Sequence, residues 1–358
     1  MIYGLLVLWS VGLLVHQQTN RPTDQQTNRP PMLSRPRRNR STPAIRNLVR
    51  ETELTVGHLV QPFFLSPQAD ARLPIPSLPG NYRLGIDEVL REIEDGMNVG
   101  LYSYMLFPAV PEEHKDKTGT YATSEDNFYL HAARAIKERF PEVCLISDVA
   151  LDPYSTDGHD GVVIDGKIDN DESLKLLDAM SVAQARAGFD IIGPSDMMDG
   201  RVGSIRRALD REGFLDTAIM SYTAKYASAF YGPFRDALDS APRKLKDVPA
   251  DKKTYQMDPG NVREALREAA LDAAEGADYL MVKPALNYLD IIYRLREAHP
   301  LPIAAYHVSG ECAMVLAAAE KGWLDYEQAA TEALLSIRRA GADVIISYFA
   351  KDFARWNA

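Results

Sequence analysis

The stretch AIMSYTAKYAS (residues 218–228) carries a lysine, Lys225, directly after an apolar run typical of a buried β-strand. A second stretch, YLMVKPA (residues 279–285), places Lys283 in the same position. Burying an unpaired ammonium group is costly, so lysines are uncommon at such positions. Two of them predict one site in which amines are held neutral and nucleophilic.

Apolar runs of similar length recur along the chain. Most are continuous rather than alternating, as expected for a parallel sheet that is covered on both faces. The eight predicted strands are residues 58–65, 102–108, 143–151, 189–194, 217–224, 279–285, 302–309 and 343–349. Apolar residues recur with the period of a helix at 86–98, 122–139, 171–187, 261–275, 288–298, 312–320 and 325–339.

Glycines directly before predicted strands (Gly188, Gly276 and Gly341) mark the ends of several of these helices. Strands that alternate with helices in this way predict an α/β fold, a closed (β/α)8 or TIM barrel. A doubly wound open sheet is the alternative, but no glycine-rich dinucleotide fingerprint follows the first strand. Catalytic groups of a barrel lie at the carboxyl ends of its strands. Polar residues gather there: Asp148, Asp152, Ser195, Asp196, Lys225, Lys283, Ser309, Glu311 and Tyr348.

The composition is that of an ordinary soluble globular protein, with 46% hydrophobic and 25% charged residues among 358. A net charge of -10 argues against nucleic acid as the main partner. The two cysteines, Cys144 and Cys312, are far apart and predict neither a disulfide framework nor a thiolate metal site. We therefore expect a reducing, cytoplasmic location.

The N-terminal region differs from the rest of the chain. Residues 1–15 are apolar but short for a membrane span, and they lack the basic start of a signal peptide. A polar repeat, QQTNRP, follows at 17–22 and 25–30 and cannot build a core. We expect translation to begin at Met32, with 1–31 an upstream or disordered extension; a membrane anchor is the alternative.

Residues 32–57 are predicted to form an arm in front of the barrel, which would span 58–358. The arm is basic, with six arginines between residues 35 and 50. A solvated arm, a contact with another subunit and a nucleic-acid patch are the three interpretations, and the acidic body disfavours the last.

A lysine at a barrel strand end predicts a Schiff base, in which a neutral amine attacks a ketone or aldehyde and the iminium acts as an electron sink. Two lysines on neighbouring strands would lower one another's pKa, because like charges disfavour the charged form. The alternative for a single lysine is a side chain whose ammonium reaches water at the rim.

Three further segments could serve this site. The loop DVALDPYSTDGHDG (148–161) offers carboxylates that suit Mg²⁺ rather than Zn²⁺, or is a solvated acidic loop. Residues 226–260 have the length of a lid over the barrel mouth, and Arg235 there could bind a carboxylate; a charged surface insertion is the alternative. Glu268 follows on a helix whose polar face would ordinarily be solvated.

Several long motifs together resemble porphobilinogen synthase, also called δ-aminolevulinic acid dehydratase. They are GTYATSEDN (119–127), DVALDPYSTDGHDG (148–161), PSDMMDGR (194–201), SYTAKYASAFYGPFR (221–235), YLMVKPA (279–285) and YHVSGE (306–311). The resemblance runs from about Arg35 to the C-terminus. It implies condensation of two 5-aminolevulinate molecules to porphobilinogen in tetrapyrrole synthesis, without an organic cofactor.

The resemblance also implies a role for each matching residue. Lys283 would hold the A-side substrate and Lys225 the P-side substrate as Schiff bases. The A-side carboxylate would be bound by Arg235, Lys252 and Gln256, and the P-side carboxylate by Ser309 and Tyr348; Asp148 and Ser195 would line the same pocket. Members are typically homo-octamers in which the N-terminal arm of each subunit wraps a neighbour, and the resemblance implies this role for the basic arm. No membrane partner is expected.

The metal implied by the resemblance is Mg²⁺. Members that use zinc carry three cysteines at the positions of Ala150, Asp152 and Asp160, so zinc is not expected here. Asp152 and Asp160 are candidates for Mg²⁺ in the active site. Glu268 matches the glutamate of a separate, allosteric Mg²⁺ site. Lys252, which is arginine in some members, keeps the charge but loses the bidentate fork.

Two alternatives from other classes stay open at this point. A class I Schiff-base aldolase acting on a phosphorylated sugar would need one lysine and a phosphate site near the last two strands. A barrel kept as a binding or assembly module would not need both lysines.

Overall fold

The computed structural model describes residues 34–243 and 245–358, and divides the chain into two units between Glu51 and Thr52. The first unit contains a 3-10 helix, η1 (Pro36–Arg40), and a short helix, α1 (Pro43–Leu48), in which no residue is buried. The Thr42 hydroxyl caps α1 by accepting a hydrogen bond from the Ile45 amide at 3.2 Å. The expectations for residues 1–31 and Met32 lie outside the described residues.

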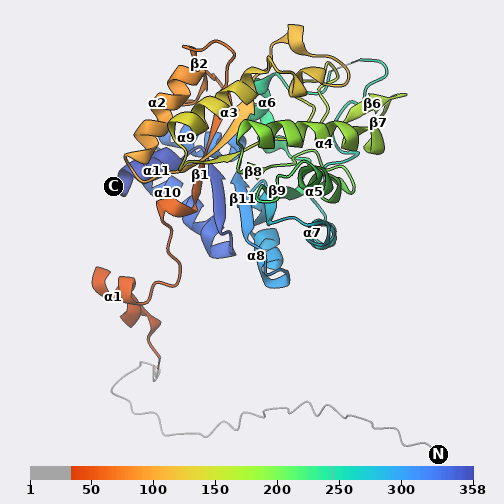
Figure 1. Cartoon of the computed structure of the whole chain (residues 1–358). Helices are drawn as coiled ribbons and strands as arrows, with labels where there is room; N and C mark the ends of the chain where they lie inside the picture. The colour runs from red at the N-terminus through yellow and green to blue at the C-terminus, as the bar shows by residue number, and fades with distance from the viewer. Residues whose placement is uncertain (1–33, 244) are drawn as a thin grey trace, which may run out of the picture. The chain divides into compact units, whose positions relative to one another are not determined.

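The second unit is a closed barrel of eight parallel strands (Figure 1). The last strand pairs with the first, with Leu59 opposite Ile345, so the sheet has no free edge within the barrel. This confirms the predicted TIM barrel and all eight predicted strands. In barrel order the strands are β1 (Leu59–Leu65), β4 (Ser103–Pro108), β5 (Cys144–Ile146), β8 (Ile191–Ile192), β9 (Ala218–Lys225), β10 (Tyr279–Lys283), β11 (Ile303–His307) and β12 (Val344–Ser347).

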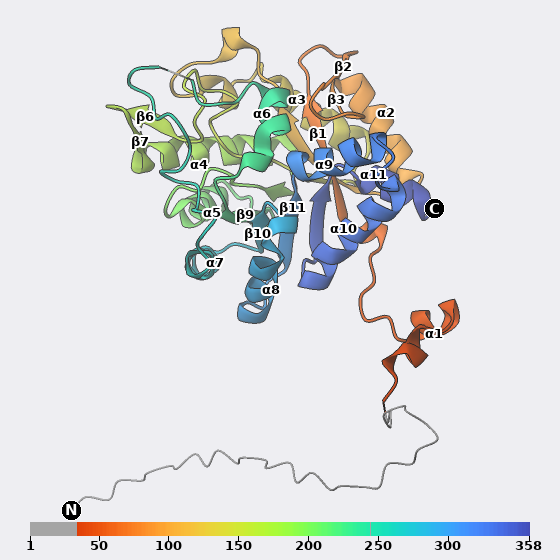
Figure 2. The same ribbon diagram turned by 180° about the vertical axis from the view of Figure 1, so that it is seen from behind.

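Helices surround the strands of this unit in both views (Figures 1 and 2). Gly188, Gly276 and Gly341 end three of them with φ of 103°, 102° and 119°, a left-handed conformation that suits glycine, as predicted. The longer helices are α2 (Ile86–Met97), α3 (Phe128–Arg139), α4 (Asn170–Ala187), α5 (Arg201–Arg211), α7 (Arg263–Glu275), α8 (Leu289–Ala298), α9 (Ser309–Glu320) and α10 (Tyr326–Ala340).

Helix α5 was not among the predicted helices. Its apolar residues Val202, Ile205 and Leu209 have helical spacing and are fully buried, so the signal is present but short. Helix α3 begins later than predicted, because Asn127 caps it by accepting from the Tyr129 amide at 3.0 Å.

Short elements decorate the barrel. The hairpin β2 (Arg72–Pro74) and β3 (Tyr82–Leu84) adds to β1, and a second hairpin joins β6 (Val162–Ile164) to β7 (Lys167–Asp169). The predicted lid contains helix α6 (Gly232–Leu238) after the turn η5 (Ala229–Tyr231). The others are η2 (Val56–His58), η3 (Glu112–His114), η4 (Thr120–Thr123), η6 (Leu286–Tyr288) and α11 (Ala350–Trp356).

Among residues 34–243 and 245–358, no helix combines the length and the apolar character needed to cross a bilayer.

Candidate active site

The two lysines lie side by side at the carboxyl ends of neighbouring strands. Lys225 ends β9, Lys283 ends β10, and the two residues are direct partners in the strand register. Both side chains are buried, at 6% and 5% exposure. The predicted proximity of the two lysines is therefore confirmed, and both side chains line the same cavity at the barrel mouth.

Aromatic rings surround the Lys283 amine. Its Nζ lies 4.4 Å from the ring centroid of Tyr306, 4.8 Å from Phe234 and 5.0 Å from Tyr222. Burial, reinforced by the nearby charge of Lys225, lowers the pKa of Lys283 from its ordinary 10.5 to about 7. A substantial fraction of this amine is consequently neutral near pH 7, which is the form that attacks a carbonyl carbon.

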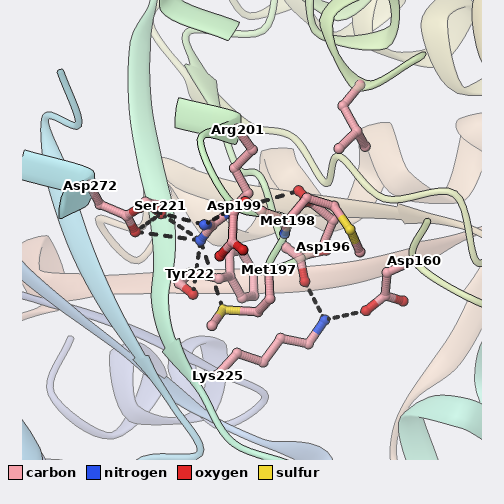
Figure 3. Close-up of polar contacts among 12 residues, drawn as sticks. Asp160, Asp196, Met197, Met198, Asp199, Arg201, Ser221, Tyr222, Lys225 and Asp272 are labelled. Atoms are coloured by element: carbon pink, nitrogen blue, oxygen red, sulfur yellow. Dashed lines mark hydrogen bonds and ion pairs between the residues drawn. The ribbon is translucent and has the colours of Figure 1, made fainter. Parts of the chain in front are cut away.

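The Lys225 amine has a polar environment instead (Figure 3). It donates to Asp160 Oδ2 at 3.0 Å and to the backbone carbonyl of Ser195. Burial alone would raise the pKa of Asp160, but the ammonium groups of Lys225 and Lys252 hold it below its ordinary value. The two lysines thus differ in kind: Lys225 is paired with a charge and Lys283 is held among rings.

Asp160 also binds the lid. The Lys252 ammonium donates to Asp160 Oδ1 at 2.6 Å and to Asp152 Oδ2 at 3.0 Å. Both aspartates are buried. Their carboxylate oxygens pair with ammonium groups: Asp152 with Lys252, and Asp160 with Lys252 and Lys225. No group of three or more His, Cys, Asp or Glu side chains in the described part of the chain is arranged to hold a metal ion. The geometry at Asp152 and Asp160 therefore does not fit the Mg²⁺ site that the loop sequence predicts.

Asp148 and Ser195 lie in the same region, as predicted. Asp148 is buried, and its backbone amide donates to Tyr129 Oη at 3.0 Å. Burial and the neighbouring Asp152 carboxylate raise the pKa of Asp148 to about 7, against the opposing charge of Lys283. A carboxyl group with this pKa can take up or release a proton near neutral pH.

The lid closes over a small cavity in front of the lysines. The cavity has a volume of about 30 Å³, which accommodates water but no organic substrate. The buried Gln256 Oε1 has no hydrogen-bond partner among residues 34–243 and 245–358. Side chains from the barrel and the lid line the cavity together: Asp152, Lys225, Tyr231, Phe234, Arg235, Ser240, Lys252, Gln256 and Lys283.

Ser309 and Tyr348 lie just after the ends of β11 and β12. The Phe234 amide donates to Ser309 Oγ at 3.0 Å, so the lid occupies the serine hydroxyl in this closed form. The hydroxyls of Tyr348 and Tyr306 are 3.3 Å apart, and Tyr306 also contacts Lys283. The two predicted carboxylate binders therefore lie near Lys283, Ser309 through its contact with Phe234 and Tyr348 through its contact with Tyr306.

A second contact ties the lid helix to the barrel. The Arg83 guanidinium donates to the carbonyl oxygens of Ala237 at 2.6 Å and Asp236 at 2.8 Å, at the end of α6. A cation at the C-terminus of a helix is favourable, because it pairs with carbonyls that have no partner within the helix. The hairpin β2–β3 thereby holds the helix that carries Phe234 and Arg235.

A cluster of buried charged and polar side chains holds the strand that ends at Lys225 (Figure 3). Arg201, at 2% exposure, donates to Ser221 Oγ at 3.0 Å and pairs with Asp272 at 3.4 Å. Asp272 also accepts from the hydroxyls of Ser221 at 2.6 Å and Thr223 at 2.7 Å. The cluster fixes β9 to α5 and α7 immediately before the lysine. The sequence did not predict this cluster. Its only sign was the position of Ser221 and Thr223 within an apolar strand, where buried hydroxyls need hydrogen-bond partners.

Glu268 lies outside this site, on α7. It lines a different cavity, of about 590 Å³, together with Asp199 and Glu264. Burial and the nearby Asp272 carboxylate raise the pKa of Glu268, with Arg201 opposing them. Glu268 and the two lysines therefore line different cavities.

Comparisons with known proteins agree over almost the whole chain. The sequence model of a family described as "Delta-aminolevulinic acid dehydratase" matches residues 33–356. The chain is 52% identical over 316 residues to the delta-aminolevulinic acid dehydratase of Chlamydia pneumoniae, covering 88% of this chain and 94% of that protein. It is 49% identical over 330 residues to the chloroplastic one of Chlamydomonas reinhardtii, covering 91% and 85%.

A solved structure gives the same match. The delta-aminolevulinic acid dehydratase (porphobilinogen synthase) from Toxoplasma gondii ME49, in complex with the reaction product porphobilinogen, superposes with a TM-score of 0.88 at 50% identity. The match covers 91% of this chain and 92% of that chain.

Proposed function

The chain belongs to the delta-aminolevulinic acid dehydratase family, and we propose that Lys225 and Lys283 carry out the family reaction through two Schiff bases. It is a lyase of porphyrin biosynthesis that condenses two molecules of 5-aminolevulinate to porphobilinogen, with release of two waters. The observation that carries the proposal is the register pairing of the two lysines at one barrel mouth. An aldolase with a single Schiff-base lysine does not need this pair, so the family assignment sets that alternative aside.

Lys283 is suited to react first with a keto group. Its neutral amine attacks the ketone carbon of 5-aminolevulinate, and the carbonyl oxygen leaves as water once it has been protonated. The resulting iminium withdraws electrons, so a neighbouring C–H loses its proton readily and becomes a carbon nucleophile. Asp148, with a pKa raised to about 7 by burial and by Asp152, is placed to exchange these protons.

Lys225 must lose a proton before it can form an imine. Its ammonium donates to Asp160 and to the Ser195 carbonyl, and a water in the cavity can receive the proton that it loses. An iminium at Lys225 keeps its positive charge beside Asp160. The second substrate is thereby held next to the first, where its amino group and carbon skeleton can close the ring.

The substrate carboxylates select which carbons meet. Arg235, Lys252 and Gln256 line the cavity on the lid side and would bind the A-side carboxylate, where Gln256 has an amide oxygen without a partner. Lys252 would then share its charge between that carboxylate and the two aspartates. Ser309 and Tyr348 would bind the P-side carboxylate once the Phe234 amide releases the serine. The closed lid excludes water, which would hydrolyse the imines.

Borohydride reduction in the presence of 5-aminolevulinate tests this assignment. Reduction converts an imine into a stable amine, so mass spectrometry should find substrate-derived label on Lys225 and Lys283. The absence of label from both lysines, in a preparation that turns over, would refute the assignment.

We propose Mg²⁺ at Glu268 and no zinc. Glu268, Glu264 and Asp199 line a cavity of about 590 Å³. They are not arranged as a set of direct ligands, so the ion would keep its water shell and Glu268 would bind it through those waters. The ion would neutralise this acidic pocket rather than take part in the chemistry. We expect Mg²⁺ to stimulate activity, with Glu268→Gln needing about tenfold more Mg²⁺, and the exposed Glu297→Gln serving as control. Inhibition by a zinc-selective chelator that only zinc reverses would contradict the proposal.

We propose that the basic arm (residues 32–57) contacts neighbouring subunits in a homo-octamer. Helix α1 has six residues and buries none of them, and Leu48 is 84% exposed. Such a short helix is unstable without a packing partner. Analytical ultracentrifugation of the full chain and of a chain that begins at Thr52 should give an octamer and a smaller species; equal masses would refute the role of the arm.

Cytoplasmic location is likewise our proposal. Its support is the Chlamydia pneumoniae relative, whose name carries no organelle, whereas the Chlamydomonas reinhardtii relative is named chloroplastic. Fractionation of cells that express the full chain, followed by immunoblotting, distinguishes the two.

A further inference from the structure

Glu311 is a buried carboxylate that the reaction outlined above does not use. It lies in the first turn of α9 and is 0% exposed. Its oxygens accept hydrogen bonds from the backbone amides of Leu286 at 2.7 Å, Val308 at 2.8 Å and Ala285 at 3.3 Å. Two of these amides follow Lys283 in the chain, and the third follows β11. One side chain therefore joins the ends of two neighbouring strands.

The backbone of Lys283 is held from the other side by the lid's first turn. The carbonyl of Lys283 accepts from the Tyr226 amide at 2.9 Å and from the Tyr231 hydroxyl at 3.1 Å. The peptide unit after the lysine is thus fixed through its oxygen by residues from the β9 side. The amides of Ala285 and Leu286, which follow in the chain, donate to Glu311. The turn after β10 is therefore hydrogen-bonded through both its carbonyl and its amide groups.

The position of the Lys283 amine depends on this backbone. In the part of the chain that the structure describes, its Nζ makes no hydrogen bond and lies close to the rings of Tyr222, Phe234 and Tyr306. Rings attract an ammonium but impose little direction on a neutral amine. The Lys225 amine differs, because Asp160 and the Ser195 carbonyl orient it directly.

Glu311 does not touch the cavity. The side chains that line the space in front of the lysines come from the barrel mouth and the lid, and Glu311 is not among them. It therefore lies too deep to bind a substrate in this form. Burial raises its pKa to about 7, and the hydrogen bonds from the backbone amides oppose this shift because they favour the carboxylate form.

We propose that Glu311 is a positioning residue: it ties the turn after Lys283 to the end of β11 and thereby aims the Lys283 amine at the substrate ketone. This inference rests on the proposed Schiff base at Lys283. Attack on a carbonyl requires the amine at a defined distance and angle, and a displacement of about 1 Å costs on the order of 100-fold in rate. The effect should be confined to Lys283, since Lys225 lies on another strand and has its own hydrogen-bond partners.

Glu311→Gln tests the proposal with little change in volume. The glutamine NH₂ group cannot accept a hydrogen bond. At least one of the three backbone amides therefore loses its acceptor and points at the N–H groups of the glutamine instead. We expect kcat to fall by about 10- to 100-fold, with KM changed by less than about threefold. We also expect borohydride label on Lys283 to form about tenfold more slowly, with label on Lys225 formed at the wild-type rate.

Two further variants complete the experiment. Glu320→Gln, at the exposed end of the same helix, should label both lysines like the wild type. If Glu311→Gln does not fold, Glu311→Asp keeps the charge with a shorter reach and should show the same selective slowing at Lys283. Wild-type labelling of Lys283 in a folded Glu311 variant, or equal slowing at both lysines, overturns the positioning role. Absence of label from Lys283 in the wild-type protein would instead refute the proposed function.

Discussion

Replacing Lys283 with methionine is expected to abolish turnover and yet to stabilise the fold. The lysine is 5% exposed, and burial together with Lys225 lowers its pKa from 10.5 to about 7. A pKa difference of one corresponds to about 1.4 kcal/mol. Protonating Lys283 therefore costs about 4 to 5 kcal/mol more in the folded protein than in the unfolded chain. Methionine removes this cost and can pack its sulfur against the rings that surround the lysine.

The sign and the pH window follow from the same shift. Between pH 7 and 10.5 the unfolded chain holds a proton on Lys283 that the folded protein has lost. The free energy of unfolding of the wild type should therefore rise with pH across this window. The advantage of Lys283→Met should be about 4 kcal/mol at pH 7 and about 2 kcal/mol at pH 9.

Urea unfolding at one fixed protein concentration measures this difference, because assembly makes apparent stability depend on concentration. Lys225→Met is the matched control on the neighbouring strand. Lys225 donates to Asp160 at 3.0 Å, so its loss leaves a buried carboxylate short of a partner and should destabilise by about 3 kcal/mol. A Lys283→Met protein that is no more stable than the wild type at pH 7, or whose advantage is equal at pH 7 and pH 9, would refute the reasoning.

Two further substitutions test the lid. Asp160→Asn removes the carboxylate shared by Lys225 and Lys252, so the free energy of unfolding in urea should fall by about 3 to 5 kcal/mol; unchanged stability would show that the two ammonium groups find other partners. Arg83→Met removes two hydrogen bonds to the end of α6, so the KM for 5-aminolevulinate should rise by about tenfold in steady-state kinetics while kcat changes little. A fall in kcat at constant KM would contradict a role in holding the lid closed.

The barrel could be predicted from the sequence because its strands are buried on both faces. Each strand is then a continuous apolar run, and the glycines after the helices give the spacing of the units. The hairpin β2–β3 has no such signal: the three residues of β2 are exposed and pair only with β3, which in turn pairs with β1. Helix α5 was missed because it has few large apolar residues: it begins with a buried arginine, Arg201, and Arg206 and Arg207 lie between Ile205 and Leu209.

The site could be predicted in part for the same reason. Strand ends meet at one mouth in any barrel, so the neighbourhood of Lys225 and Lys283 follows from the order of the strands. The order of the strands does not predict which residues pair with the carboxylates. Asp160 pairs with a lysine 65 residues further along the chain and with another in the lid. The spacing within its own loop indicated oxygen ligands and could not show that lysines would occupy them.

The small closed cavity has a consequence for ligand discovery. A volume of about 30 Å³ offers a docked compound no space, so a screen against this form would find nothing at the lysines. Any competitive inhibitor must be selected against a conformation in which Phe234 has withdrawn from Ser309. Compounds that bear two acidic arms and no carbonyl group could bind that conformation without reacting. Their binding would report lid opening separately from imine chemistry, for instance through faster hydrogen exchange at the Phe234 amide.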